Sequence, residues 1–313
     1  MSEDARSGVG PRLGAIRDLV ASSIGRVPDV PGPERTVPDP LPDGAFELVK
    51  VDAGDLWISR DDEVMRPYMQ RARTWEAEEG RLLLSFVRPG CRFLDIGANV
   101  GYFSVLVGKA APGVTVDAVE PDPDNVRALR FNLWTNRVAA TVWPLALDNQ
   151  DRHLALSGNA HNLGDLRSGR VDPDEHRDPT EDAPVARNRQ PISSGTELPR
   201  NWIVPAASGD ELFGDRGFDL VKVDVQGWEF EVLLGLDGVL SRSPGVHVVT
   251  EFWPAPLRAN NRHPTDVLAR YRQLGYRVRV ALGDDVVEMP DAEVVDVCDS
   301  GGPDGQVNLL LER

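Results

Sequence analysis

The chain has 313 residues, 41% of them hydrophobic, and its 50 acidic side chains outnumber the 34 basic ones to give a formal net charge of −16. Such a balance argues against a protein that grips a nucleic-acid backbone or an anionic membrane, and no apolar run approaches the roughly 18 residues that a membrane span needs. We expect a cytoplasmic globular protein that acts on a small molecule, without nucleic-acid or membrane partners.

Residues 1–90 predict an extension in two parts. In residues 1–44, apolar residues recur at helical spacing between Leu13 and Ile24, which predicts a short amphipathic helix that packs on the main fold or on a partner chain, as in a homodimer. Six prolines follow in residues 25–44 and predict an extended, stiff linker. Residues 45–90 predict two short strands and then a mainly helical segment, which together form a cap over the main fold.

From residue 91 to residue 313, strand and helix patterns alternate. Helices are expected at 101–110, 123–135 and 265–274, and seven strands at 92–96, 115–120, 141–146, "FDLVKV", 246–251, 276–282 and 306–311. This alternation predicts one α/β domain with a doubly wound, mostly parallel, seven-stranded sheet. The last two strands flank an acidic, glycine-rich loop and can pair as an antiparallel hairpin at the sheet edge.

A polar insert at about 157–201 interrupts the alternation. Its stretch "SGRVDPDEHRDPTEDAPVARNRQPISSGTELPR" is too polar to bury, and an unstructured insert of this length is uncommon inside a compact domain. The sequence leaves two interpretations open, a lid near a site and a disordered segment.

The stretch "FLDIGANVGYF" places Asp95, Gly97, Asn99 and Gly101 at the turn after the first strand of this domain. Ligands bind there in doubly wound sheets, because backbone N–H groups can approach them at the carboxyl ends of the strands. Glu120 ends the next strand, 19 residues beyond Gly101, at the spacing from which an acid can bind both ribose hydroxyls. Asp95 would repel a pyrophosphate and the third glycine of a dinucleotide site is absent, so the residues favour S-adenosylmethionine, a cationic cofactor without phosphate.

Three motifs, "FLDIGANVGYFSVL", "AVEPDPDNVRALRFNLWTN" and "FDLVKVDVQGWEFEVLLG", occur in this order. Together they resemble the FkbM family of S-adenosylmethionine-dependent methyltransferases, a branch of the class I methyltransferase fold, over residues 75–253. The resemblance implies O-methylation of a sugar or secondary-metabolite hydroxyl in natural product biosynthesis. It also implies a set of cofactor contacts: Asp95, Gly97, Asn99 and Gly101 at the methionine and ribose, Glu120 at the ribose hydroxyls, Pro121 and Asp122 at the adenine border, and Ala146 near the adenine ring.

Methyl transfer to an alcohol requires alignment of the nucleophile and a group that takes its proton. Asp224 and Glu251, at the ends of the fourth and fifth strands, are candidate catalytic residues, and His161 in a Gly/Asn-rich loop is a third. The two acids can act as base and orienter or share a divalent metal, and the sequence assigns no metal ligand. The competing interpretations are that Asp224 only caps a helix and that Glu229 is a solvated or salt-bridged helix residue.

Other functions remain open at this point. An N- or carboxyl-methyltransferase would use the same cofactor site, and a non-catalytic scaffold could retain the fold. A dinucleotide-dependent oxidoreductase or epimerase would need a three-glycine turn. A nucleic-acid methyltransferase would need an Asp/Asn-Pro-Pro-aromatic motif where this chain has "DVQGWE". The acceptor and the methylated atom are not identified by the sequence.

Overall fold

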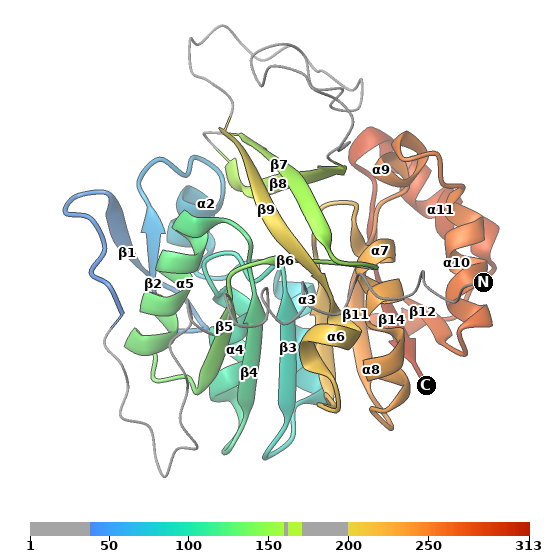
Figure 1. Cartoon of the computed structure of the whole chain (residues 1–313), viewed down its shortest axis with the longest axis horizontal. Helices are drawn as coiled ribbons and strands as arrows, with labels where there is room; N and C mark the ends of the chain where they lie inside the picture. Colours follow the sequence, from blue (N-terminus) through green and yellow to red (C-terminus); the bar gives the residue numbers. More distant parts are fainter. Residues whose placement is uncertain (1–37, 160–161, 171–199) are drawn as a thin grey trace, which may run out of the picture. The chain divides into compact units, whose positions relative to one another are not determined.

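The computed structural model describes residues 38–159, 162–170 and 200–313. Within these ranges the strands form an eight-stranded sheet, a four-stranded sheet and a two-stranded sheet (Figure 1). The helix predicted between Leu13 and Ile24, and most of the proline-rich linker, lie outside them. No helix in the described ranges has the length and apolar character to cross a membrane.

The eight-stranded sheet carries the fold. Its strand order is β13-β12-β14-β11-β10-β3-β4-β5, and β14 is antiparallel to both of its neighbours, whereas β11, β10, β3, β4 and β5 are parallel. This confirms the predicted doubly wound, mostly parallel sheet. The strands are β3 (Arg92–Ile96), β4 (Thr115–Val119), β5 (Ala140–Trp143), β10 (Leu220–Val223), β11 (His247–Phe252), β12 (Arg277–Leu282), β13 (Asp285–Val287) and β14 (Val307–Glu312).

Three details of the predicted sheet are wrong. The described sheet has eight strands instead of seven, because β13 pairs with β12. The last two predicted strands, β12 and β14, pair antiparallel as expected, but β14 lies between β11 and β12 instead of at the edge of the sheet. The segment predicted as an acidic loop contains β13 and helix α11 (Asp291–Ser300), which buries Val294, Val295 and Cys298. The spacing of these three apolar residues is helical, and the surrounding acids obscured it.

Helices cover both faces of this sheet, with α4 behind the strands and α6 and α8 in front in Figure 1. Helix α5 begins where the Asp122 carboxylate accepts hydrogen bonds from the N–H groups of Asp124 and Asn125, with Pro123 as the first helical residue. The other helices are α2 (Met65–Ala72), α3 (Ala77–Phe86), α4 (Tyr102–Ala110), α6 (Gly209–Phe213), α7 (Glu229–Gly235), α8 (Asp237–Ser241), α9 (Pro254–Ala259) and α10 (Pro264–Gln273); α5 is Pro123–Thr135.

The four-stranded sheet corrects the prediction of an unstructured polar insert. Its order is β6 (Ala146–Asp148), β9 (Arg200–Ser208), β7 (Arg152–Asn159) and β8 (Asn162–Arg170), so strands occupy both ends of the insert, while residues 171–199 lie outside the described ranges. Antiparallel pairing satisfies the backbone of such polar segments without full burial. The strand predicted at 141–146 is divided at Pro144, because proline lacks the N–H that a sheet ladder needs.

The predicted strand pair of the cap is present as β1 (Phe46–Lys50) and β2 (Asp55–Ser59), and α5 holds it through two asparagines. Asn132 accepts from Trp57 N at 2.7 Å and donates to Trp57 O at 3.0 Å and to Val100 O at 2.8 Å. Asn136 makes the equivalent pair of bonds with Asp55. The two amide side chains thus satisfy backbone N–H and C=O groups of β2.

Replacing Asn132 with Ala should lower the free energy of unfolding by about 2–3 kcal/mol, because buried backbone groups of β2 and of the turn before α4 lose their partners. Urea unfolding followed by circular dichroism measures this change. Asn260→Ala, at an exposed asparagine, should change it by less than about 0.5 kcal/mol. Equal effects of the two variants would contradict the role given to Asn132.

Candidate active site

A cleft of about 840 Å³, including the solvent at its mouth, lies at the carboxyl ends of β3, β4 and β10. Six of the residues predicted from sequence line it: Gly97, Asn99, Glu120, Pro121, Ala146 and Asp224. The walls also include Leu147 of β6 and Leu156 of β7, so the four-stranded sheet contributes to the site. Trp75, which precedes α3, closes the cleft from the side of the cap.

Glu120 follows β4 and is only 3% exposed. Its Oε2 accepts from Asn99 N at 2.8 Å and its Oε1 from Asp122 N at 2.9 Å. Burial raises the pKa of Glu120 to about 7, although these backbone donors favour the ionised form. A carboxylate has about four acceptor positions, so Glu120 keeps capacity for hydroxyl groups in the cleft.

The turn after β3 runs directly against the end of β10. Gly97 has a φ of 78°, and a Cβ atom built on it would lie 1.8 Å from Asp224 O, so only glycine fits. Asn99, also left-handed at φ 50°, directs into the buried region an Oδ1 atom that has no hydrogen-bond partner among the described residues. The turn therefore presents backbone and an unused acceptor to the cleft.

Asp95, Gly101 and Asp122 do not line the cleft, and the structure gives each a supporting position. Asp95 is fully buried and accepts from Ser104 Oγ at 2.6 Å. Gly101 precedes α4 at a φ of 92°, where a Cβ would lie 2.6 Å from Leu129 Cδ1. Asp122 caps α5. These residues fix the walls against which a ligand would lie.

Lys222, in the middle of β10, was not identified from sequence. It is 1% exposed, its Nζ donates to Asp224 Oδ2 at 3.0 Å, and it lies 4.7 Å from the centre of the Phe103 ring. Burial alone would lower the pKa of Lys222, but the carboxylates of Asp224, Glu79, Asp95 and Glu76 outweigh burial and raise it. A lysine inside the apolar strand "LVKV" was the available signal, since lysine is almost never fully buried without a partner.

Glu76 and Glu79, at the start of α3, face the same lysine from the cap. Burial raises the pKa of Glu79 well above its usual range, and Lys222 opposes this effect. Burial also raises the pKa of Glu76, which Asp224 raises further and Lys222 lowers. Lys222 thereby links the cap electrostatically to the centre of the sheet.

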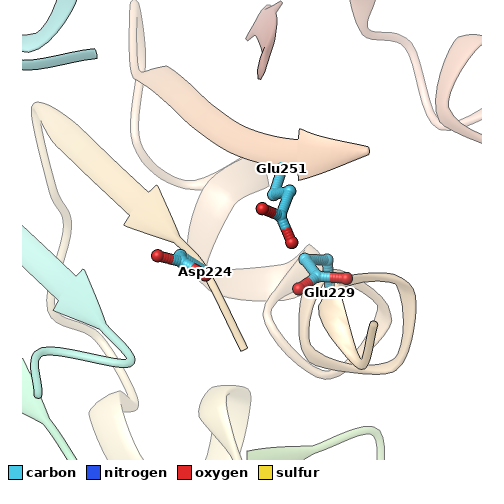
Figure 2. Close-up of side chains that lie close together, drawn as sticks. All are labelled: Asp224, Glu229 and Glu251. Atoms are coloured by element: carbon cyan, nitrogen blue, oxygen red, sulfur yellow. The ribbon is translucent and has the colours of Figure 1, made fainter. Parts of the chain in front are cut away.

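Asp224 and Glu251 come together as expected, and Glu229 joins them (Figure 2). Carboxylate oxygens of the three residues lie within 4.8 Å of one another. Burial raises the pKa of Glu229 to about 7. The pKa of Glu251 is raised well above its usual range, first by burial and then by the negative charges of Asp224 and Glu229. The interpretation of Glu229 as solvated or salt-bridged is wrong, since it is 4% exposed and accepts backbone hydrogen bonds.

Two further expectations concerned the helix after β10 and the loop histidine. Asp224 does not cap the following helix, because α7 begins five residues later at Glu229. His161 lies outside the described residues. The site that the described residues form is therefore built on carboxylates and a lysine.

The sequence matches the methyltransferase FkbM domain over residues 95–278. It is 42% identical over 64 residues to the 31-O-demethyl-FK506 methyltransferase FkbM of Streptomyces tacrolimicus, covering 20% of this chain and 25% of that protein. It is 27% identical over 179 residues to the AMB antimetabolite synthetase AmbE of Pseudomonas aeruginosa, covering 48% of this chain and 8% of that protein. The matched stretches thus span a quarter or less of these relatives.

Among solved structures, the chain is similar to a precorrin-6y C5,15-methyltransferase from Geobacter metallireducens, with a TM-score of 0.40 and 14% identity over 77% of this chain and 92% of the other. It is also similar to a tRNA (uracil-54, C5)-methyltransferase from Pyrococcus abyssi, with a TM-score of 0.40 and 15% identity over 86% of this chain and 44% of the other.

Lys222→Met should lower the free energy of unfolding by about 3–5 kcal/mol at about pH 8, because it leaves several buried carboxylates without their cation. A carboxyl whose pKa is raised on folding binds more protons in the folded state than in the unfolded state. Its contribution to stability is therefore lost as the pH rises from the unfolded-state pKa, 4.5 for Glu79, through the higher pKa of the folded state. The variant should therefore recover stability toward about pH 5 more than the wild type does.

Urea unfolding at the two pH values measures this difference. Lys50→Met, at an exposed lysine of β1, is the matched control and should follow the wild type at both. A pH-independent loss of stability in the Lys222 variant would contradict the electrostatic account.

Proposed function

The chain belongs to the FkbM family of S-adenosylmethionine-dependent methyltransferases, whose domain matches more than half of its length, and we propose that it methylates a hydroxyl oxygen of a small molecule. The observation that carries this proposal is the position of Asp224, a carboxylate that lines the same cleft as Glu120. Because β3 lies between β10 and β4, these two acids flank the Gly97 turn, one on each side. One cleft can therefore hold a nucleoside and an acceptor next to each other.

The residues of the cleft fit S-adenosylmethionine, which would supply an electrophilic methyl group. Glu120 keeps acceptor capacity for ribose hydroxyls beside its two backbone bonds. Asn99 Oδ1 and Trp228 Nε1 are buried in the lining without partners among the described residues, so the cleft offers an acceptor and a donor to polar groups of a ligand. The surrounding carboxylates suit a cationic cofactor without phosphate.

In this proposal, Asp224 receives the acceptor hydroxyl. Lys222 and Gln226 hold its two oxygens at 3.0 and 3.1 Å, which orients the carboxylate. An acceptor O–H that donates to Asp224 would be aligned for in-line attack, and its proton would pass to this carboxylate as the new C–O bond forms. Glu229, whose pKa burial raises to about 7, has a carboxylate oxygen within 4.8 Å of one of Asp224, a separation that one bridging water can span.

The acceptor class is proposed on the same basis. An oxygen acceptor requires a proton-accepting group at the reacting end of the cleft, and the described lining supplies Asp224 there. The Streptomyces relative is, by its name, a methyltransferase for an O-demethylated compound. We therefore favour a hydroxyl of a sugar or secondary-metabolite intermediate over an amine or a carboxylic acid.

Calorimetric titration should show one site for S-adenosylmethionine, and Glu120→Ala should weaken binding by at least about tenfold, because the ribose loses its charge-assisted hydrogen bonds. Affinity for the wild type should increase as pH rises through about 7, because the ionised Glu120 is the better acceptor, and then level off. Glu293→Ala, at an exposed acid of α11, is the control and NAD the competing ligand. Preference for NAD, or no binding by folded protein, would rule out the proposal.

Asp224→Asn should lower kcat by about 10²–10⁴, because the variant orients the hydroxyl but cannot take its proton, while the Kd for S-adenosylmethionine stays within about threefold. A screen of glycosides and polyhydroxylated natural products, read out as S-adenosylhomocysteine release, supplies the acceptor for this measurement. Asp296→Asn, on the exposed side of α11, controls for loss of surface charge. An unchanged kcat in the Asp224 variant would remove it from the mechanism.

A further inference from the structure

Asp224, Glu229 and Glu251 reach one point in space from three different elements. Asp224 directly follows β10, Glu229 is the first residue of α7, and Glu251 lies in β11, which pairs in parallel with β10 (Figure 2). One carboxylate oxygen from each lies within 4.8 Å of the others. Two oxygens bound to the same Mg²⁺ at about 2.1 Å are at most about 4.2 Å apart, so small side-chain rotations suffice to place all three on one ion.

Glu251 supplies an observation independent of this clustering. The residue is 9% exposed, and its Oε2 atom is buried without a hydrogen-bond partner among the described residues. Figure 2 shows its carboxylate directed toward the space between Asp224 and Glu229. A buried carboxylate oxygen without a donor is costly, so a missing ligand at this position would explain the arrangement.

Among the described residues, the cations near this oxygen are bound to other carboxylates. Lys222 donates to Oδ2 of Asp224, and Gln226 donates to Oδ1 of the same carboxylate. Arg262 is paired with Glu231, also on α7. Burial and four other carboxylates all raise the pKa of Glu251, which shows that acids dominate its surroundings. A dication would neutralise the charge that Lys222 does not.

Glu229 is already oriented for such a role. Its Oε1 accepts from Val225 N and Gly227 N, both at 3.0 Å, in the turn between β10 and α7. These bonds hold Oε1 and thereby orient the carboxylate. Backbone donors that orient a ligating side chain in this way are typical of metal sites.

We propose that Asp224, Glu229 and Glu251 bind one divalent cation of the Mg²⁺ or Mn²⁺ class at the acceptor end of the cleft. The ligand set contains only carboxylate oxygens, which favours these hard cations over zinc or copper. Asp224 also lines the cleft, so the ion would lie next to the space for an acceptor.

The chemical role of this ion rests on the proposed function. An acceptor hydroxyl bound to the cation becomes more acidic and loses its proton to solvent or to a neighbouring carboxylate. Its oxygen then forms the bond to the methyl carbon, the C–S bond breaks, and the electron pair of that bond remains on the sulfur of the leaving S-adenosylhomocysteine. The positive charge of the sulfonium is consumed and the released proton balances the step.

The test is titration of the full chain with Mn²⁺ after dialysis against EDTA, followed by electron paramagnetic resonance of the free ion. One site is expected, with Mg²⁺ as a competitor and a rise in Tm when either ion is bound. Glu251→Gln and Glu229→Gln should each weaken Mn²⁺ binding by at least about tenfold. Glutamine keeps the shape of both side chains, and its amide oxygen in the Glu229→Gln variant would still accept the two backbone bonds, so these variants should fold. The control variant Glu293→Gln should bind Mn²⁺ as the wild type does.

Two results would overturn the proposal: no Mn²⁺ binding by the folded wild type, or equal binding by wild type and both glutamine variants. Titration of Glu251→Gln with S-adenosylmethionine tests the cofactor site separately from the metal site. The cofactor site lies at Glu120, so this variant should keep its affinity for S-adenosylmethionine. Loss of Mn²⁺ binding with intact cofactor binding supports the metal site. Binding of Mn²⁺ without any binding of S-adenosylmethionine would refute the proposed function alone.

Discussion

The buried ammonium group of Lys222 is the constraint around which the site is built. A cation at the centre of a sheet is stable only where anions surround it, and Asp224, Glu79, Asp95 and Glu76 provide this environment from three parts of the chain. Glu76 and Glu79 belong to the cap, whereas Asp95 lies in β3. The same charge that stabilises the lysine therefore holds the start of α3 beside the cleft.

A steric constraint acts at the same place. Because the Gly97 turn touches the backbone of Asp224, the loops after β3 and β10 have a fixed separation. The nucleoside side of the cleft and the carboxylate side thus share a backbone contact instead of being placed by flexible loops. Such preorganisation suits methyl transfer, where the enzyme contributes mainly alignment of two reactants.

The sequence predicts the parts of this site that depend on local rules. Gly97, Asn99 and Glu120 follow from strand ends and their spacing, and the parallel sheet follows from the alternation of strands and helices. Lys222 and Glu229 were missed, because their importance comes from burial by distant elements, which one strand or helix does not reveal. The insertion of β14 between β11 and β12 depends on long-range pairing in the same way, as does the pairing of β6 with β9 across the insert.

The distribution of charge explains how one cleft can serve two partners. Burial raises the pKa of Glu79 and of Asp95 and Lys222 opposes this rise, whereas burial and four other carboxylates all raise the pKa of Glu251. The described site therefore has a neutralised half beneath the Gly97 turn and an acidic half beyond Asp224. A sulfonium next to this acidic half would be attracted to it, whereas a phosphate would be repelled. The acidic half retains a charge that a second cation can satisfy, so the cofactor choice and the proposed metal binding would have the same electrostatic origin.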